Sequence, residues 1–127
     1  MLIDLETGNI NLDGVIFHKG FTFEEFKKTQ LYKNQDEKMV IFLLKTKIDK
    51  YEYYTSVYFN SCIISKIYLE VEDERITGFE NVPQLKYIHD NILKEYGIID
   101  GKKYSWVTIS SVFDPKGCVS SIIIEYQ

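Results

Sequence analysis

The sequence predicts an α+β domain built on one mostly antiparallel sheet, with about seven strands and two helices in the order β-β-α-β-β-β-α-β-β. Three observations support this class. Residues 40–73 contain three segments in which apolar and polar side chains alternate with a period of two, as in half-buried strands. Residues 81–97 instead show the period of an amphipathic helix. Two β-branched runs close the chain on either side of "FDPKGC".

The length and composition predict a single globular domain that spans residues 1–127. The chain has 127 residues, of which 45% are apolar and 27% are charged, so it can bury a core without disulfides or a metal. Repeats, low-complexity tracts and linkers are absent from the sequence. We therefore expect no domain boundary.

The N-terminal quarter predicts a hairpin followed by a short helix. "LIDLETGNINL" reads as two short strands around a turn at residues 7–9, where Gly8 suits a positive φ. In residues 22–30, Thr22 and Glu25 have the spacing of a capping box. Phe23 and Phe26 then share one side of a helix of barely two turns.

Residues 40–48 and 51–59 predict a hairpin around Asp49-Lys50. In a two-residue register, Thr46 faces Tyr53, Lys45 faces Tyr54, and one face of the hairpin is apolar. A slip of one residue would exchange the two faces, so the pattern itself supports the register.

Residues 63–73 extend this meander, with Ile67 and Leu69 on one side and Tyr68 and Glu70 on the other. Tyrosines that alternate with carboxylates on an outward sheet face are typical of a protein interface. The alternative is that the short helix or the N-terminal hairpin covers this face. The candidate partner-binding residues are Tyr54, Tyr58, Tyr68, Glu52, Glu70, Glu72, Ile41, Leu43 and Ile64.

The last third predicts the main helix and two strands. Pro83 fits the first turn of a helix over residues 81–97, and Gly97 fits the position just after its end. "DPKG" has the residues of a type I turn followed by a left-handed glycine. The two strands that flank it are apolar on both sides, so we expect them near the centre of the sheet, with the helix over one face.

No constellation of catalytic or metal-ligating residues emerges from the sequence. The only histidines are His18, in a loop, and His89, at the rim of the helix stripe, and nothing resembles a zinc motif. Cys62 and Cys118 are expected to be structural rather than nucleophilic. The acidic run 70–75 lacks the pattern of a calcium loop. We therefore expect no catalytic residue, metal or cofactor, and these absences favour a non-enzymatic protein over an enzyme.

The charge distribution narrows the class of partner. The net charge of −4 disfavours nucleic acid and favours a basic protein partner, although "GKKYSW" places two lysines beside aromatic residues. The longest apolar run, "MVIFLL", is too short to cross a bilayer, and no signal peptide is recognisable. These features predict no membrane association and a cytoplasmic location.

The two ends of the chain carry a family resemblance. "IDLETGNINLDG", "GFTFEEF" and the closing "YSWVTISSVFDPKGCVSSIIIEY" resemble the ends of a group of small single-domain bacterial proteins, most of which have no assigned function. Some similar small acidic proteins act as immunity proteins for secreted antibacterial toxins. The resemblance covers the first 26 and last 23 residues, and its motifs are turns and caps rather than sites.

The function expected from all this is a non-enzymatic protein-binding domain, an immunity-type inhibitor that occludes a bacterial toxin, in particular a basic toxin domain. Two alternatives stay open. The first is a small-ligand-binding or enzymatic domain with a pocket between sheet and helix, using His89 and a cysteine. The second is a homo-oligomeric structural protein that associates through an edge strand or the tyrosine face.

Overall fold

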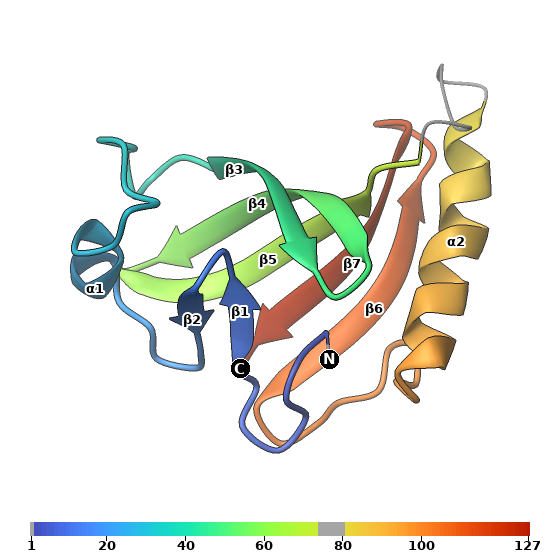
Figure 1. The fold of residues 1–127 in the computed structure, drawn as a ribbon, viewed down its shortest axis with the longest axis horizontal. Helices are drawn as coiled ribbons and strands as arrows, with labels where there is room; N and C mark the ends of the chain where they lie inside the picture. The colour runs from blue at the N-terminus through green and yellow to red at the C-terminus, as the bar shows by residue number, and fades with distance from the viewer. Residues whose placement is uncertain (1, 74–80) are drawn as a thin grey trace.

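The computed structural model describes residues 2–73 and 81–127 (Figure 1). It confirms the α+β class and the predicted order of elements. The elements are β1 (Ile10–Leu12), β2 (Val15–Phe17), α1 (Phe23–Lys27), β3 (Ile41–Ile48), β4 (Tyr51–Asn60), β5 (Ile63–Val71), α2 (Val82–Glu95), β6 (Val107–Asp114) and β7 (Val119–Tyr126).

The strands divide between two antiparallel sheets. β1 and β2 pair only with each other, and the main sheet has the order β3-β4-β5-β7-β6. β7 pairs with β5, so it lies inside the sheet as expected, whereas β7 is the one described strand that pairs with β6, which forms an edge. The expectation that both closing strands are central was therefore wrong for β6. Strand order depends on contacts between distant segments, which the composition of one strand does not reveal.

The N-terminal hairpin turns later in the sequence than expected. Residues 2–9 contain no strand, and the hairpin is made by β1 and β2 around Asp13-Gly14. Both turn residues have positive φ, 52° and 89°, as a type I′ turn requires. Asp-Gly between "INL" and "VIF" is a stronger hairpin signal than the Gly8 turn, so this correction was readable from the sequence.

Helix α1 begins as its capping residues predict. The Thr22 hydroxyl accepts a hydrogen bond from the Glu25 amide (3.1 Å). The short helix is held by tertiary contacts, because Phe23 and Phe26 are buried against Phe59 at ring-centroid distances of 5.4 and 5.8 Å. Residues 21–23 also bond to the start of β5, through the Phe23 amide to the Cys62 carbonyl (2.8 Å).

A bulge in β3 changes the register of the first long hairpin. Close to the turn the pairs are as predicted, including Thr46 with Tyr53. Further along, Leu43 and Leu44 together oppose Thr55, because the pairing shifts between Phe42 and Lys45. The extra residue reverses the orientation of everything before it. Ile41 and Leu43, expected on the outward face, are buried in the core.

A second bulge does the same to the start of β5. The pair Tyr58 with Lys66 is followed by Phe59 with Ile64, which leaves Ser65 as the extra residue. Ile64, expected on the outward face, therefore lies in the core, while Ile63 is exposed. The same register places Tyr54 opposite Glu70. Each correction has one cause, a single inserted residue that reverses the alternation.

One hydrophobic core lies on the inner face of the main sheet, which we define as the face packed against α1, α2 and the β1–β2 hairpin. Buried side chains of β4, β5 and β7, such as Val57, Leu69 and Ile124, meet Leu85 and Ile92 of α2 there. Figure 1 shows the sheet strongly twisted, with β1, β2 and α1 over one end and α2 along β6 at the other. On the opposite, outer face, no helix or further strand packs among the residues that the structure describes.

The turn between β6 and β7 has the predicted position but not the predicted conformation. The Asp114 carboxylate accepts a hydrogen bond from the Lys116 amide (3.0 Å), as in an Asx turn. The left-handed residue is Cys118, with φ 52°, rather than Gly117. Within the described residues, no helix is long and apolar enough to span a membrane.

Candidate functional site

The outer face of the main sheet contains an open groove of about 720 Å³. All five strands of the main sheet supply apolar or aromatic side chains to this groove. We call it the outer groove, and its lining residues are Phe42, Leu44, Tyr54, Thr55, Ser56, Tyr58, Tyr68, Glu70, Val112, Asp114, Val119, Ser121 and Ile123.

The hollow arises from small side chains between large ones. One row of paired residues crosses the whole sheet, from Phe42 through Ser56, Tyr68 and Ile123 to Ser110. Cross-strand neighbours on one face lie about 5 Å apart, so a serine between two aromatic residues leaves its share of the surface unfilled. The strong twist of the sheet, increased by the β3 bulge, adds curvature to the same region.

Four of the predicted partner-binding residues line the outer groove. Tyr54 and Tyr58 are exposed, and Tyr68 and Glu70 are partly buried. The rings of Tyr58 and Tyr68 contact each other, with centroids 5.1 Å apart. No helix or strand within residues 2–73 and 81–127 covers these tyrosines, and α1 and the β1–β2 hairpin pack on the inner face instead of shielding them as the alternative required.

The other predicted residues lie elsewhere. Glu52 is exposed opposite Lys47, outside the groove, and Glu72 forms an ion pair with Lys45 (3.0 Å). Ile41, Leu43 and Ile64 belong to the core, for the reason given above.

Sequence reasoning missed the most exposed apolar residues of the groove. Phe42 and Leu44 are 67% and 79% exposed, and the β3 bulge is what turns them outward. Val112 and Val119, on the C-terminal hairpin, are also exposed there. Only the pairing of β7 with β5 brings them next to the tyrosines.

Leu44 combines a strained backbone with an exposed side chain. Its φ is 61°, in the left-handed region that glycine adopts most readily and that a bulky side chain rarely occupies. A leucine that is strained and also exposed contributes little to folding. Strain of this kind is concentrated at functional sites, so the strained Leu44 marks the rim of the outer groove as a candidate site.

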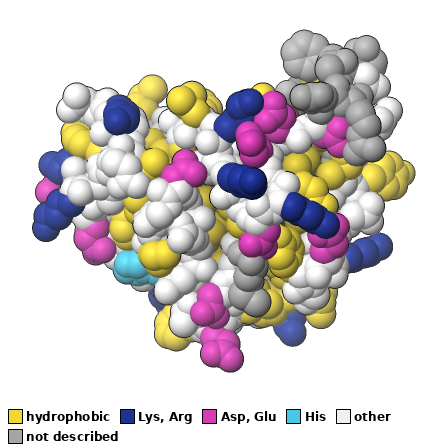
Figure 2. Space-filling view, viewed as in Figure 1, with side chains coloured by type: hydrophobic (Ala, Val, Ile, Leu, Met, Phe, Trp, Pro, Cys, Tyr) yellow, Lys and Arg dark blue, Asp and Glu magenta, His cyan; other side chains and the backbone are white. Residues whose placement is uncertain are grey.

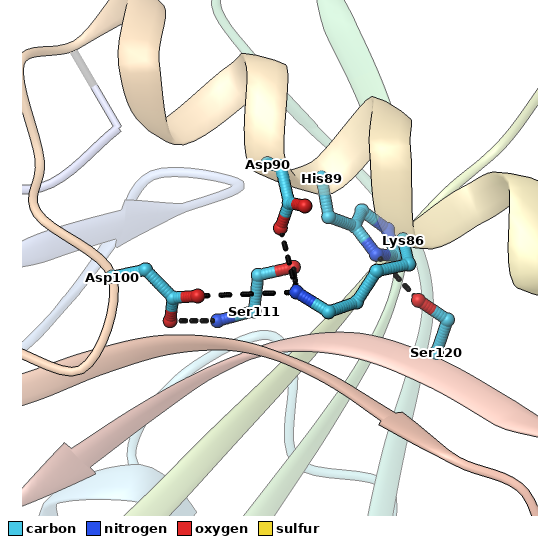
Figure 3. A network of polar contacts seen from close by, with 6 residues as sticks. All are labelled: Lys86, His89, Asp90, Asp100, Ser111 and Ser120. Atoms are coloured by element: carbon cyan, nitrogen blue, oxygen red, sulfur yellow. Dashed lines mark hydrogen bonds and ion pairs between the residues drawn. The ribbon is translucent and has the colours of Figure 1, made fainter.

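The polar contacts of His89 exclude one catalytic arrangement. Its ring is fully buried; Nε2 accepts a hydrogen bond from the Val71 amide (3.0 Å) and Nδ1 lies 3.1 Å from the Ser120 hydroxyl (Figure 3). Because Nε2 is an acceptor, the neutral ring carries its proton on Nδ1 and donates it to Ser120. The ring therefore cannot take a proton from Ser120, and the pair joins α2 to β5 and β7.

A second set of contacts joins the same helix to β6. The Lys86 ammonium lies 2.8 Å from an Asp90 oxygen and 3.9 Å from an Asp100 oxygen, and Asp100 accepts a hydrogen bond from the Ser111 amide (2.8 Å; Figure 3). Burial lowers the pKa of His89 to about 4, so the ring is neutral at pH 7. These side chains hold the helix on the sheet, and they surround the fully buried ring of His89, which the alternative of a ligand-binding or enzymatic pocket between sheet and helix would use.

The two cysteines lie in turns of the main sheet. Cys62 is exposed in the β4–β5 turn, where a hydrogen bond to Glu37 raises the pKa of its thiol. This is opposite to the cationic surroundings that activate a thiolate. Cys118 is partly buried at the β6–β7 turn.

Several acidic side chains elsewhere form ion pairs with lysines, such as Glu24 with Lys27 (3.0 Å) and Glu95 with Lys50 (3.3 Å). The face drawn in Figure 2 shows basic and acidic side chains next to one another at its centre. Within residues 2–73 and 81–127, no three His, Cys, Asp or Glu side chains are placed to hold a metal ion. Two residues of the acidic run considered above, Glu74 and Arg75, lie outside the described residues.

Comparisons with known proteins identify a similar fold. No protein-family model matches the sequence, and no curated protein matches it. One chain of a solved structure, that of Rhs1-CT in complex with cognate immunity protein RhsI1, is similar with a TM-score of 0.56. The similarity covers 98% of this chain and 86% of that chain, at 15% sequence identity. At this identity the likeness shows a common fold, and it agrees with the resemblance to small immunity proteins noted in the sequence.

Proposed function

We propose that this chain is a non-enzymatic protein-binding domain, an immunity-type inhibitor that binds a bacterial toxin through the outer groove and occludes it. The observation that carries the proposal is the exposure of Phe42, Leu44 and Tyr54 around one groove, on a sheet face that no described helix or strand covers. Exposed apolar and aromatic residues gathered in this way are typical of a protein interface, where such residues supply most of the binding energy.

Two further observations support an inhibitor over other binding proteins. An inhibitor that acts by occlusion needs a surface complementary to its target and no catalytic groups. The outer groove offers such a surface. The fold is also similar to a chain from a complex that contains an immunity protein. The strain at Leu44 fits the same function, because it places an apolar side chain at the groove rim at some cost to folding.

The test is protection against a defined toxin domain. A candidate toxin domain, chosen from the genes that neighbour the gene for this chain, is expressed in a bacterial host with and without the chain, and binding of the purified pair is measured by calorimetry. The wild type is expected to restore growth and form a stable complex. The Phe42→Ser/Leu44→Ser double variant should bind several hundredfold more weakly, because two apolar anchors that each contribute on the order of 2 kcal/mol together cost about 4 kcal/mol.

A matched control separates the groove from exposed apolar surface in general. Tyr87 on α2 is 72% exposed and does not line the groove, so Tyr87→Ser should protect as the wild type does. The proposal fails if the wild type neither protects nor binds, or if the groove variant binds as tightly as the control. Light scattering of the free chain tests self-association through the groove, which would contradict the proposal if it persisted in place of the complex.

A further inference from the structure

The outer groove has charge of one sign only. Among its lining residues the charged ones are Glu70 and Asp114, both carboxylates, and no lysine, arginine or histidine lines it. The Asp114 carboxylate is engaged in the β6–β7 turn by the Lys116 amide. Glu70 lies within the tyrosine-rich part of the groove, directly opposite Tyr54 on the neighbouring strand.

Glu70 also differs from Glu72 and Glu125, two other acidic residues of the outer face, because no ion pair with a lysine engages it in the described structure. Glu72 pairs with Lys45 at 3.0 Å, and Glu125 pairs with Lys66 at 3.3 Å. Within the described part of the chain, no hydrogen-bond donor or cation contacts the Glu70 carboxylate, although the side chain is partly buried. Burial raises the pKa of Glu70, as expected for a carboxylate that has lost water without gaining a partner.

A carboxylate surrounded by aromatic side chains suits a particular type of ligand group. A lysine or arginine side chain carries a cation at the end of an apolar stem, so it can satisfy the carboxylate while its stem covers the tyrosine rings. An arginine would also stack on those rings. An anionic group would meet an uncompensated negative charge, and a purely apolar group would leave the carboxylate buried and unpaired.

We infer that Glu70 is the docking point for a lysine or arginine side chain of the partner protein, which enters the outer groove between Tyr54 and Tyr68. This inference rests on the proposed function and adds the chemistry of the partner: a segment that presents a cation flanked by apolar residues. Glu70 thus determines specificity, while Phe42 and Leu44 supply apolar contact.

The first test uses a defined probe and needs no toxin. Phenethylammonium and its neutral analogue 2-phenylethanol are titrated into the ¹⁵N-labelled chain, and amide shifts are followed by NMR. The cation is expected to shift amides of β3, β4 and β5 around the groove and to bind about tenfold more tightly than the alcohol, because a charge-assisted hydrogen bond is available only to the cation. Glu70→Gln should abolish this preference, and Glu52→Gln, at an exposed carboxylate outside the groove, should retain it.

The second test uses the toxin domain of the previous section. Glu70→Gln is expected to weaken binding by about tenfold or more, as for other partly buried charge pairs at interfaces, and Glu52→Gln to leave it unchanged. If the wild type binds the toxin domain and Glu70→Gln binds equally well, the inference is overturned and the proposed function stands.

The remaining outcomes separate the two claims. If the wild type binds no toxin domain, the proposed function fails, and the inference about a partner's cation fails with it. In that case, a preference for phenethylammonium that depends on Glu70 would assign the groove to small cationic ligands. Equal binding of the cation and the alcohol by the wild type, or shifts confined to other surfaces, would overturn the inference directly.

Discussion

The buried His89 makes a strong prediction about the pH dependence of stability. The ring is neutral in the folded protein, where it accepts a hydrogen bond from the Val71 amide and donates one to Ser120. Protonation of Nε2 would set its N–H against the N–H of the Val71 amide, and it would also place a positive charge in the core. The pKa of His89 is therefore about 4 in the folded state, against 6.5 for an unperturbed histidine.

The magnitude follows from the linkage between proton binding and folding. Between pH 6.5 and about 4 the unfolded chain binds a proton at His89 and the folded chain does not, so acid favours unfolding. At about 1.4 kcal/mol per pKa unit, the free energy of unfolding loses about 3 kcal/mol across this window because of His89. Above pH 6.5 the contribution is fully present and does not vary with pH.

The assay is urea unfolding of the wild type and of His89→Gln at several pH values, followed by fluorescence of the single tryptophan, Trp106. The variant is less stable at pH 7, and its stability should fall by about 3 kcal/mol less between pH 6.5 and 4, since glutamine does not titrate. Carboxylates titrate alike in both proteins, so the difference between the curves isolates His89. Parallel curves, or an NMR titration that places the His89 pKa near 6.5, would refute the reasoning.

Three further predictions concern single side chains, each measured by chemical unfolding. Glu70→Gln should raise the free energy of unfolding at pH 7. Folding raises the pKa of Glu70, so its ionisation opposes the folded state as the pH rises above 4.5. The control Glu52→Gln should leave the free energy of unfolding unchanged, and destabilisation by Glu70→Gln would contradict the account of an unpartnered carboxylate. Leu44→Gly should be about 1 kcal/mol more stable than Leu44→Ala, since only glycine relieves the positive φ, and the reverse order would show that no strain is present. Tyr53→Phe should stabilise the fold by about 1 kcal/mol, because the Tyr53 hydroxyl is buried without a hydrogen-bond partner in the described structure. A clear loss of stability would show that the hydroxyl does form a hydrogen bond.

Much of the fold was predictable because its signals are local. The alternation in β4, the capping of α1 by Thr22 and the turn at Asp114 each depend on neighbouring residues. Where the prediction failed locally, at Asp13-Gly14, the sequence contained the stronger signal.

The candidate site was only partly predictable because its geometry depends on pairing between strands. Leu43 and Leu44 are both leucine, so nothing in the pattern shows which of them faces the core. The bulge that decides this is defined by the partner strand, where Thr55 alone opposes both. The same holds for Val119, which reaches the tyrosines only through the pairing of β7 with β5.

The separation of the sheet into a packed inner face and an open outer face has an evolutionary consequence. Side chains such as Phe42, Tyr54 and Val119 are exposed and lie beneath no other described element, so we expect their replacement to leave the packing of the interior intact. If the outer groove is the binding site that we propose, recognition can diversify among descendants while the scaffold persists. For the same reason, a library randomised at these positions would let an engineer select binders to new targets without first restoring foldability.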